Sequence, residues 1–290
     1  MYSALPKARV LAAVEFFLWK AANTTRFRNI RVPNDRTKPC GFGVAYNKHE
    51  VTQISFEKIR EVVAYDLRNA IFSLGDILIL QNGGIPMGSN LSAAEAIMSC
   101  AHMENEFHES LGTDTRFLAV TRATDDCLGL TVFSKSRPDT KQKALSLIHR
   151  YQTECYDSNL ILEREEIKNN TTRFLEAKLD FSDRQIRTQH FSRNYDHLRK
   201  FGKQRFKNGQ HADSFTDKNM KLGAIIGRCV AISLTCQRKS DILVSMRKYF
   251  YDCRKRGYSI KILKKACRRM YHKTGLNVWR TLGNSREMRC

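Results

Sequence analysis

Apolar residues recur every three or four positions along much of the chain, which is the spacing of an amphipathic helix. The clearest case begins after Ser55, where Ile59, Val63 and Leu67 form one stripe with Val62 and Ile71 beside it. Ser55 itself is a suitable N-cap. The pattern predicts helices over about 7–22, 55–72, 92–107, 139–155, 240–257 and 259–275. Ser92 and Glu95 have the spacing of a capping box at the third of these helices.

Alternation of apolar and polar residues marks the strands. It is strongest from Phe117 to Phe133, where Leu118 and Val120 precede a polar pair, and Leu128 and Leu130 follow it. We expect a β-hairpin there. Shorter strands are expected over 76–80, 159–167 and 171–181, an irregular polar segment over 23–54, and a glycine-rich loop, QNGGIPMGSN, over 81–90.

The composition is that of a globular protein with a substantial core. The chain has 290 residues, of which 42% are hydrophobic, enough for one large domain or two modest ones. No apolar run approaches the roughly 20 residues needed to span a bilayer. Lys7, Arg9, Glu15 and Lys20 interrupt the first apolar segment, so it does not resemble a secretion signal. We therefore expect an intracellular protein, nuclear or cytoplasmic, with no membrane partner.

The nine cysteines show no CxxC pair and are odd in number. Neither a disulfide framework nor a zinc site is favoured by this pattern. We expect most of them to be small apolar core residues.

Charge divides the chain unevenly. The net charge is +21 from 50 basic and 29 acidic residues, and 26 of the basic but only 6 of the acidic residues lie in 187–290, a net of +20. We therefore divide the chain into 1–186 and 187–290. A cation excess of this size favours a nucleic-acid partner over a merely solvated basic surface or an anionic membrane.

Two groups of cations within the basic third are candidates for nucleic-acid contacts. One occupies a single face of the helix over 259–275; the other alternates with Tyr195, Phe201 and Phe206, which suits backbone contact with some base stacking. A solvated face and a basic loop flanked by core aromatics are the plainer alternatives. The predicted contacts are Lys200, Lys203, Arg205, Lys207, Lys261, Lys264, Lys265 and Arg268.

Adjacent carboxylates, Asp125 and Asp126, interrupt the apolar hairpin. A polar turn is the simple explanation. The order of a glycine-rich loop entering a helix, a hairpin with paired aspartates and a basic helical end suggests more. QNGGIPMGSNLSAAEA and ATDD resemble the loop–helix motif and the catalytic hairpin of the reverse transcriptase family, and 37 residues separate Gly88 from Asp125, which also fits.

The resemblance implies an α+β fold. Residues 1–186 would form a polymerase palm, an antiparallel sheet packed by helices, and residues 187–290 a basic, mainly helical thumb-like region. It also implies an RNA-directed DNA polymerase of retroelement type, with Asp125 and Asp126 as catalytic and metal-binding residues. The implied nucleotide- and template-binding residues are Tyr2, Gln81, Gly84, Ile85, Pro86, Met87, Gly88 and Ser89.

The chemistry explains why such residues are needed. Two divalent ions, about 3.5–4 Å apart, can clamp the attacking and leaving oxygens of a phosphoryl transfer. The implied cofactors are two Mg²⁺ (or Mn²⁺) ions, and the implied partners are an RNA template, a DNA primer, deoxynucleoside triphosphates and the remainder of a larger polymerase. Metal binding would also offset the repulsion between the two carboxylates.

Two departures from the family pattern keep other functions open. Ala123 stands where the family has an aromatic residue, and the third carboxylate of the family would lie about four residues before Tyr2, upstream of Met1. Asp66 and Asp76 do not fit that role; we expect them to be capping or solvated residues. The alternatives are a catalytically degenerate palm that binds RNA or DNA, and an aspartate-dependent nuclease.

Overall fold

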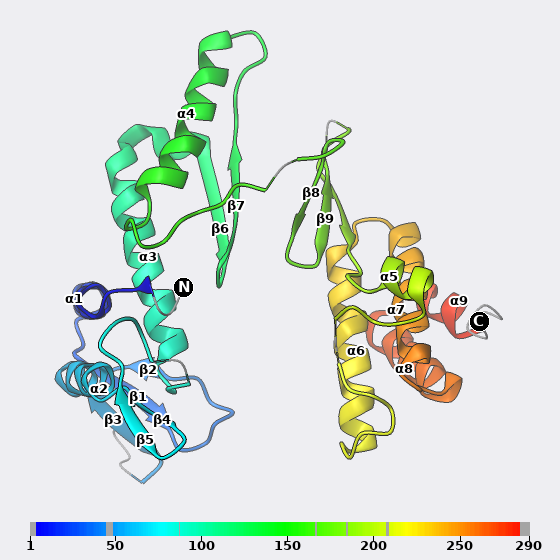
Figure 1. Ribbon diagram of the computed structural model, residues 1–290, viewed down its shortest axis with the longest axis horizontal. Coiled ribbons are helices and arrows are strands. Elements are labelled where there is room, and N and C mark those ends of the chain that lie inside the picture. The colour runs from blue at the N-terminus through cyan, green and yellow to red at the C-terminus, as the bar shows by residue number, and fades with distance from the viewer. Residues whose placement is uncertain are drawn as a thin grey trace. The chain divides into compact units, whose positions relative to one another are not determined.

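A computed structural model describes residues 4–44, 49–86, 88–165, 167–183, 185–206 and 209–284 (Figure 1). The chain forms two compact units, Met1–Arg164 (unit 1) and Glu165–Cys290 (unit 2). Each unit has buried apolar cores of its own. The boundary between the two units lies earlier in the chain than the change in charge between residues 186 and 187. The division of function that we based on charge stays a prediction.

The helices of unit 1 are α1 (Lys7–Thr25), α2 (Phe56–Arg68), α3 (Ser92–Leu111) and α4 (Pro138–Glu154). Val10 and Val14 of α1 lie in one core with Ala96 and Met103 of α3. All four helices were predicted. The predicted cap of α2 is confirmed, because the Ser55 hydroxyl accepts a hydrogen bond from the Lys58 N–H at 3.1 Å.

Two details of the predicted apolar stripes are wrong. Val62 is exposed rather than buried. Ile71 lies outside the helix, because Asn69 ends α2 by donating from its side chain to the Tyr65 carbonyl at 2.8 Å. Ile71 is therefore the first residue of a strand.

Small antiparallel sheets complete unit 1. One has the order β2-β1-β3, from β1 (Asn29–Pro33), β2 (Gly41–Phe42) and β3 (Val51–Ser55). It corrects the expectation of an irregular segment over 23–54. The other two are hairpins, β4 (Ile71–Leu74) with β5 (Ile77–Leu80) and β6 (Leu118–Ala123) with β7 (Asp126–Thr131), the last preceded by the 3₁₀ helix η2 (Gly112–Phe117).

Unit 2 begins with a three-stranded antiparallel sheet of order β10-β9-β8, from β8 (Thr171–Phe174), β9 (Ala177–Asp180) and β10 (Arg187–His190). The helices α5 (Tyr195–Phe201), α6 (Lys218–Thr235), α7 (Lys239–Lys255), α8 (Ile260–Thr274) and α9 (Asn277–Asn284) follow. The strand expected over 159–167 is wrong: residues 161–165 have no regular structure, and the Leu162 carbonyl accepts instead from the Gln152 side chain at 3.0 Å.

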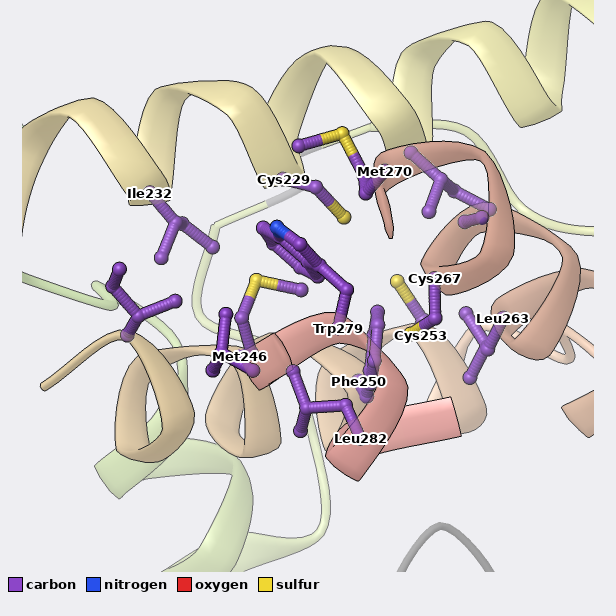
Figure 2. Close-up of a cluster of buried hydrophobic side chains, with 14 of the residues drawn as sticks. Cys229, Ile232, Met246, Phe250, Cys253, Leu263, Cys267, Met270, Trp279 and Leu282 are labelled. Atoms are coloured by element: carbon purple, nitrogen blue, oxygen red, sulfur yellow. The ribbon is translucent and has the colours of Figure 1, made fainter. Parts of the chain in front are cut away.

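The core of unit 2 is built around Trp279 (Figure 2). Its indole ring lies among sulfur-containing side chains from three other helices, including Cys229, Met246 and Cys267. The expectation that most cysteines are core residues is confirmed for the described ones: Cys100, Cys155, Cys229, Cys236, Cys253 and Cys267 are buried, and none of these six forms a disulfide. Cys40 is exposed and Cys127 half-buried.

None of the helices within the described ranges combines the length and the apolar character that crossing a bilayer requires.

Candidate nucleic-acid and metal site

The two aspartates lie at the tip of the β6–β7 hairpin, as predicted. Ala123 pairs with Asp126, so only Thr124 and Asp125 form the loop. Thr124 has φ = 60°, the left-handed conformation that so tight a turn requires. Both carboxylates are exposed, and neither forms a hydrogen bond or ion pair with any residue that the structure describes.

The carboxylates suit a hard divalent cation in part. Mg²⁺ takes oxygen ligands, keeps several waters and shares substrate phosphates, so two exposed carboxylates can hold it without a closed protein cage. Across the described ranges, however, no group of three or more His, Cys, Asp or Glu side chains comes together. Asp125 and Asp126 therefore offer an open pair of ligands.

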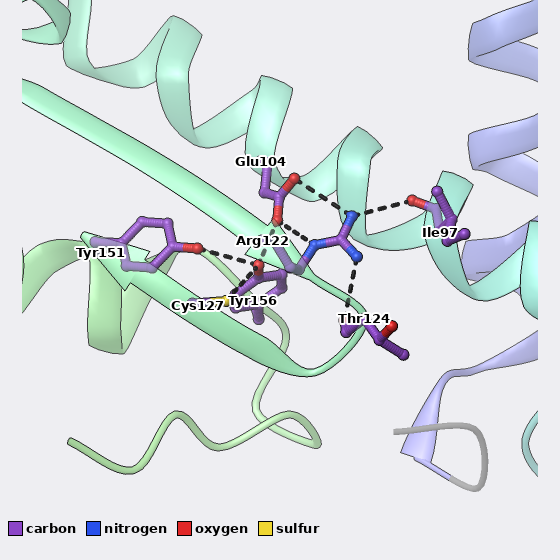
Figure 3. A network of polar contacts seen from close by, with 7 residues as sticks. All are labelled: Ile97, Glu104, Arg122, Thr124, Cys127, Tyr151 and Tyr156. Carbon is purple, nitrogen blue, oxygen red and sulfur yellow. Dashed lines mark hydrogen bonds and ion pairs between the residues drawn. The ribbon is translucent and has the colours of Figure 1, made fainter. Parts of the chain in front are cut away.

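A polar network anchors the hairpin beside its tip (Figure 3). The Arg122 guanidinium donates from Nε to Glu104 Oε1 at 2.5 Å and from its terminal nitrogens to the carbonyls of Ile97 (3.3 Å) and Thr124 (3.2 Å). Glu104 also accepts from the Tyr156 hydroxyl at 2.5 Å. The Arg122 guanidinium thus links the backbone one residue before Asp125 to α3.

Tyr156 is held in turn by the Tyr151 hydroxyl at 3.1 Å and lies 3.8 Å from Cys127 Sγ. Burial, followed by the hydrogen bond to Glu104, raises the pKa of Tyr156 well above its usual range. Tyr156 therefore stays protonated and donates to Glu104 at any physiological pH. This network was not foreseen in the sequence, because its residues come from α3, β6, β7, α4 and the segment that follows α4.

Hydrogen bonds from Gln81, its first residue, hold the glycine-rich loop together. Gln81 donates from its side chain to the carbonyls of Gly83 (2.8 Å) and Ile85 (3.1 Å), and its own carbonyl accepts from Lys7 Nζ at 2.7 Å. Ile85 is fully buried in the core of α1 and α3. These contacts give Gln81 and Ile85 structural roles, and their predicted role in nucleotide binding is left untested.

Glycine is required at two of the predicted loop positions. Gly84 and Gly88 have φ = 75° and 101°, which side-chain-bearing residues rarely adopt. Gly88 is exposed, and a Cβ built there would meet no atom within 4 Å. Open space at Gly88 is what close approach of a ligand to the backbone needs.

Ser89 and Pro86 connect the loop to two helices. The Ser89 hydroxyl donates to Asp66 of α2 at 2.8 Å, and the Ser92 hydroxyl of α3 donates to the Pro86 carbonyl. Asp66 is therefore a partner of the loop, which corrects the expectation that it caps a helix or is solvated. The capping box is also wrong, since Leu91 occupies the N-cap and the Glu95 carboxylate bonds to no described group.

Glu95, in the first turn of α3, is fully buried, and neither carboxyl oxygen has a hydrogen-bond partner in the described chain. Burial, with a smaller contribution from the charge of Asp66, raises its pKa to about 7. The first turn of α3, which follows the loop, therefore holds a buried carboxyl group whose pKa lies near neutral pH.

The loop and the hairpin tip approach the same end of α3. The loop leads into Ser92, and Arg122 binds the carbonyl of Ile97, five residues later, which is about 7.5 Å along a helix axis. Two further predicted site residues, Tyr2 and Met87, lie outside the described residues.

In unit 2, α8 carries the predicted basic face. Lys261, Lys265 and Arg268 are exposed and Lys264 is half-exposed, while Leu263, Ala266 and Met270 are fully buried on the opposite side. None of the four cations forms an ion pair with a described residue. The amphipathic arrangement is confirmed, and contact with phosphates stays a prediction.

The second predicted group of cations lies at the end of α5 and after it. Lys200, Lys203 and Arg205 are exposed. Lys200 Nζ lies 5.0 Å from the ring of Phe201, and the Arg205 guanidinium 5.4 Å from the ring of Phe206. Exposed cation–aromatic pairs of this kind suit the binding of single-stranded nucleic acid. Lys207 lies outside the described residues.

Comparison with known proteins finds similarity in fold. No protein-family model and no curated protein sequence matches the chain. Telomerase from Candida albicans, solved with a TWJ fragment of telomeric RNA, is similar over 99% of this chain and 45% of its own, with a TM-score of 0.57 and 10% identity. Apo telomerase from Candida tropicalis is similar over 94% of this chain and 41% of its own, with a TM-score of 0.47 and 15% identity.

The chain thus spans less than half the length of the telomerases it matches. Telomerase is a specialised reverse transcriptase. The likeness to the Candida albicans enzyme shows that the mixed helices and small antiparallel sheets of this chain are similar in fold to that telomerase.

Proposed function

We propose that the chain belongs to a polymerase of reverse transcriptase type, in which unit 1 carries the metal-binding hairpin and unit 2 binds nucleic acid. The observation that carries this proposal is the position of Asp125 and Asp126 on an anchored hairpin, in a chain similar in fold to a telomerase; both carboxylates are exposed and have no partner among the described residues. The reaction would be template-directed DNA synthesis on RNA, of retroelement type.

Asp125 and Asp126 would hold Mg²⁺ or Mn²⁺. Bound there with the substrate, two such ions would neutralise charge on the transferring phosphoryl group. The contribution of this chain is to fix the ligands, which the bonds of Arg122 to Glu104 and to the Thr124 carbonyl support. The exposed backbone at Gly88 would approach the incoming deoxynucleoside triphosphate or the template base.

Unit 2 would bind the RNA template and the DNA primer. The net charge of +20 over 187–290 supports a polyanionic partner, and the cations of α8, which pair with no described residue, suit the phosphate backbone. The telomerase with the similar fold was solved with an RNA, which agrees with this assignment. The remaining parts of such a polymerase would come from a larger polypeptide.

A second function, binding of RNA or DNA without catalysis, is favoured by two observations. Ala123 offers no ring to pack beneath a primer end, and no third acidic side chain joins the aspartate pair among the described residues. In that case unit 2 would bind nucleic acid as proposed and the hairpin would be inert.

Mn²⁺ binding separates the two functions. We would measure Mn²⁺ electron paramagnetic resonance with the full chain, an RNA template, a DNA primer and a deoxynucleoside triphosphate. The polymerase proposal expects bound Mn²⁺ that is lost in Asp125→Asn and kept in Asp139→Asn, a matched change of an exposed aspartate on α4. Nucleic-acid binding with no difference between these variants would establish the binding module instead.

Primer extension provides the catalytic test. In any preparation that extends the primer, Asp125→Asn should reduce the rate by on the order of 10³-fold or more, because ligand loss removes several kcal/mol of transition-state stabilisation. Extension that survives Asp125→Asn would contradict the assignment of the hairpin as the catalytic site.

A further inference from the structure

Unit 2 contains a cavity of about 460 Å³ that no part of the proposed polymerase site uses. His190 and Ser192 line it from the end of β10, Met220 and Ala224 from α6, and Tyr249 from α7. Its volume is within the range of small-molecule sites, about 300–1,000 Å³.

Four of the five charged side chains in the walls form two ion pairs. Arg228 forms an ion pair with Glu176, and Arg256 pairs with Asp252 at 3.0 Å. An inorganic phosphate or a triphosphate inside the cavity would therefore compete with carboxylates already in place. The interior favours a neutral ligand with polar edges.

His190 provides hydrogen-bonding capacity that the protein itself does not use. The residue is 92% buried, since its exposed fraction is 8%, and both ring nitrogens lack a partner in the described chain. Burial, and then the charge of Arg228, lowers its pKa to about 4, with Lys248 acting in the same direction and Glu176 against it. A neutral imidazole presents one donor and one acceptor.

The rest of the lining is suited to a flat molecule. Met220, Ala224 and Ile225 form an apolar wall on α6, and the Tyr249 side chain is also in the lining. The hydroxyls of Ser192 and Thr216 make no hydrogen bond to a described residue. Apolar walls with a few unused polar groups at the edges match the faces and edges of a nucleobase.

A cation with no partner lies among the lining residues. Arg193 is exposed, and it forms neither an ion pair nor a hydrogen bond within the described ranges. Next to a neutral cavity, such a guanidinium suits the phosphate of a nucleotide whose base has entered.

We propose that this cavity receives one unstacked nucleobase of a single strand bound to unit 2, with His190 hydrogen-bonding the base edge. This inference rests on the proposed nucleic-acid binding by unit 2 and adds a base-recognising contact to it. A nucleobase could reach the cavity from a strand or from a free nucleoside, and the experiment distinguishes the two.

The test compares two short single-stranded RNAs, one normal and one in which the internal nucleotides are abasic, so that both carry the same phosphates. Fluorescence anisotropy with the full chain should show the abasic strand binding about 5- to 100-fold more weakly. Ala224→Phe, which fills the cavity from an exposed helix position, should reduce binding of the normal strand towards the abasic level. Leu234→Phe, at an exposed position of the same helix outside the lining, should change neither.

Thr216→Val is a second variant that keeps the shape of the side chain and removes only a hydroxyl. It should reduce the preference for the normal strand without altering binding of the abasic strand. Circular dichroism melting would establish that each variant is folded.

Free adenosine and uridine, followed by saturation-transfer NMR, form the second arm. Binding that Ala224→Phe abolishes would support the cavity as a nucleoside site even if the strand enters elsewhere. A folded Ala224→Phe variant with an unchanged preference for the normal strand and unchanged nucleoside binding would overturn the inference and leave nucleic-acid binding intact. A wild-type chain that binds neither RNA nor nucleoside would overturn both.

Discussion

Arg122 and Glu104 form an ion pair that is largely shielded from water, with 10% and 23% of their side chains exposed. The pair fixes the strand that leads into Asp125. Removal of one partner leaves the other charge desolvated and unpaired, which costs more than loss of an exposed pair. The geometry of the aspartate pair therefore depends on residues that need never touch a substrate.

Arg122→Met tests this dependence. The variant should lower the free energy of unfolding by about 2–3 kcal/mol, because Glu104 keeps only the bond from Tyr156. Arg150→Met, which removes an exposed helical pair with Glu154, should cost less than about 1 kcal/mol. Equal losses in urea denaturation would contradict the role given to Arg122.

Glu95 gives the protein a pH dependence of known sign. Its pKa is raised from 4.5 to about 7, so the folded chain holds this proton more tightly than the unfolded chain. The stabilisation is complete below pH 4.5 and decreases as the pH rises towards 7. At about 1.4 kcal/mol per pKa unit, the decrease is about 3 kcal/mol at most.

Glu95→Gln is the matched variant, because the amide keeps the shape and cannot ionise. The difference in unfolding free energy between wild type and variant should change steadily from pH 4.5 to pH 7. A difference that stays constant over this range would mean that Glu95 is already ionised in the folded protein.

At the scale of elements, α8 has a fully buried apolar face and an opposite face whose cations form no ion pair with a described residue. Replacement of Lys261, Lys265 and Arg268 by Gln should weaken binding to single-stranded RNA. The slope of log K against log salt should fall by about 2, at about 0.7 per phosphate contact. Folding should be unaffected, because all three side chains are exposed.

The matched control is the removal of three exposed cations of unit 1, Lys135, Arg137 and Lys141, by the same change to Gln. This variant should keep most of the affinity and the wild-type salt slope. If both triple variants lose affinity equally, the charge acts as a general field and α8 is no specific contact surface.

Elements defined by local signals could be predicted from the sequence. The helix α8 is bounded by Ser259 and by Gly275, whose φ of 68° ends it, and the β6–β7 hairpin has its turn within two residues. The sheet of β1, β2 and β3 could not, because Asn29 pairs with Ser55 across 26 positions and β2 has only two residues.

The candidate site also contains residues that the sequence predicts and residues that it does not predict. The aspartate pair and the glycine loop are continuous in sequence, so their positions followed from local pattern. The bond from Tyr156 to Glu104 joins residues 52 positions apart, and the cavity of unit 2 collects residues from Glu176 to Tyr258. Such contacts depend on tertiary packing, for which a single sequence carries no periodic signal.

At the scale of the whole molecule, the two units have separate cores. Leu263→Ala should destabilise unit 2 by about 2–5 kcal/mol, because Leu263 is fully buried and its loss leaves a cavity. Hydrogen exchange should then show less protection in α6, α7 and α8 and unchanged protection in α1 and α3. A parallel loss in all five helices would show that the units unfold together.

The burial of Trp279 has a practical consequence for such measurements. The sequence contains only one other tryptophan, Trp19 on α1, which is 62% exposed, whereas Trp279 is fully enclosed in the core of unit 2. The emission of Trp19 already comes from an indole in contact with water. A red shift of the intrinsic fluorescence during denaturation therefore reports the opening of the second core, which gives the unmodified protein a spectroscopic probe of that unit alone.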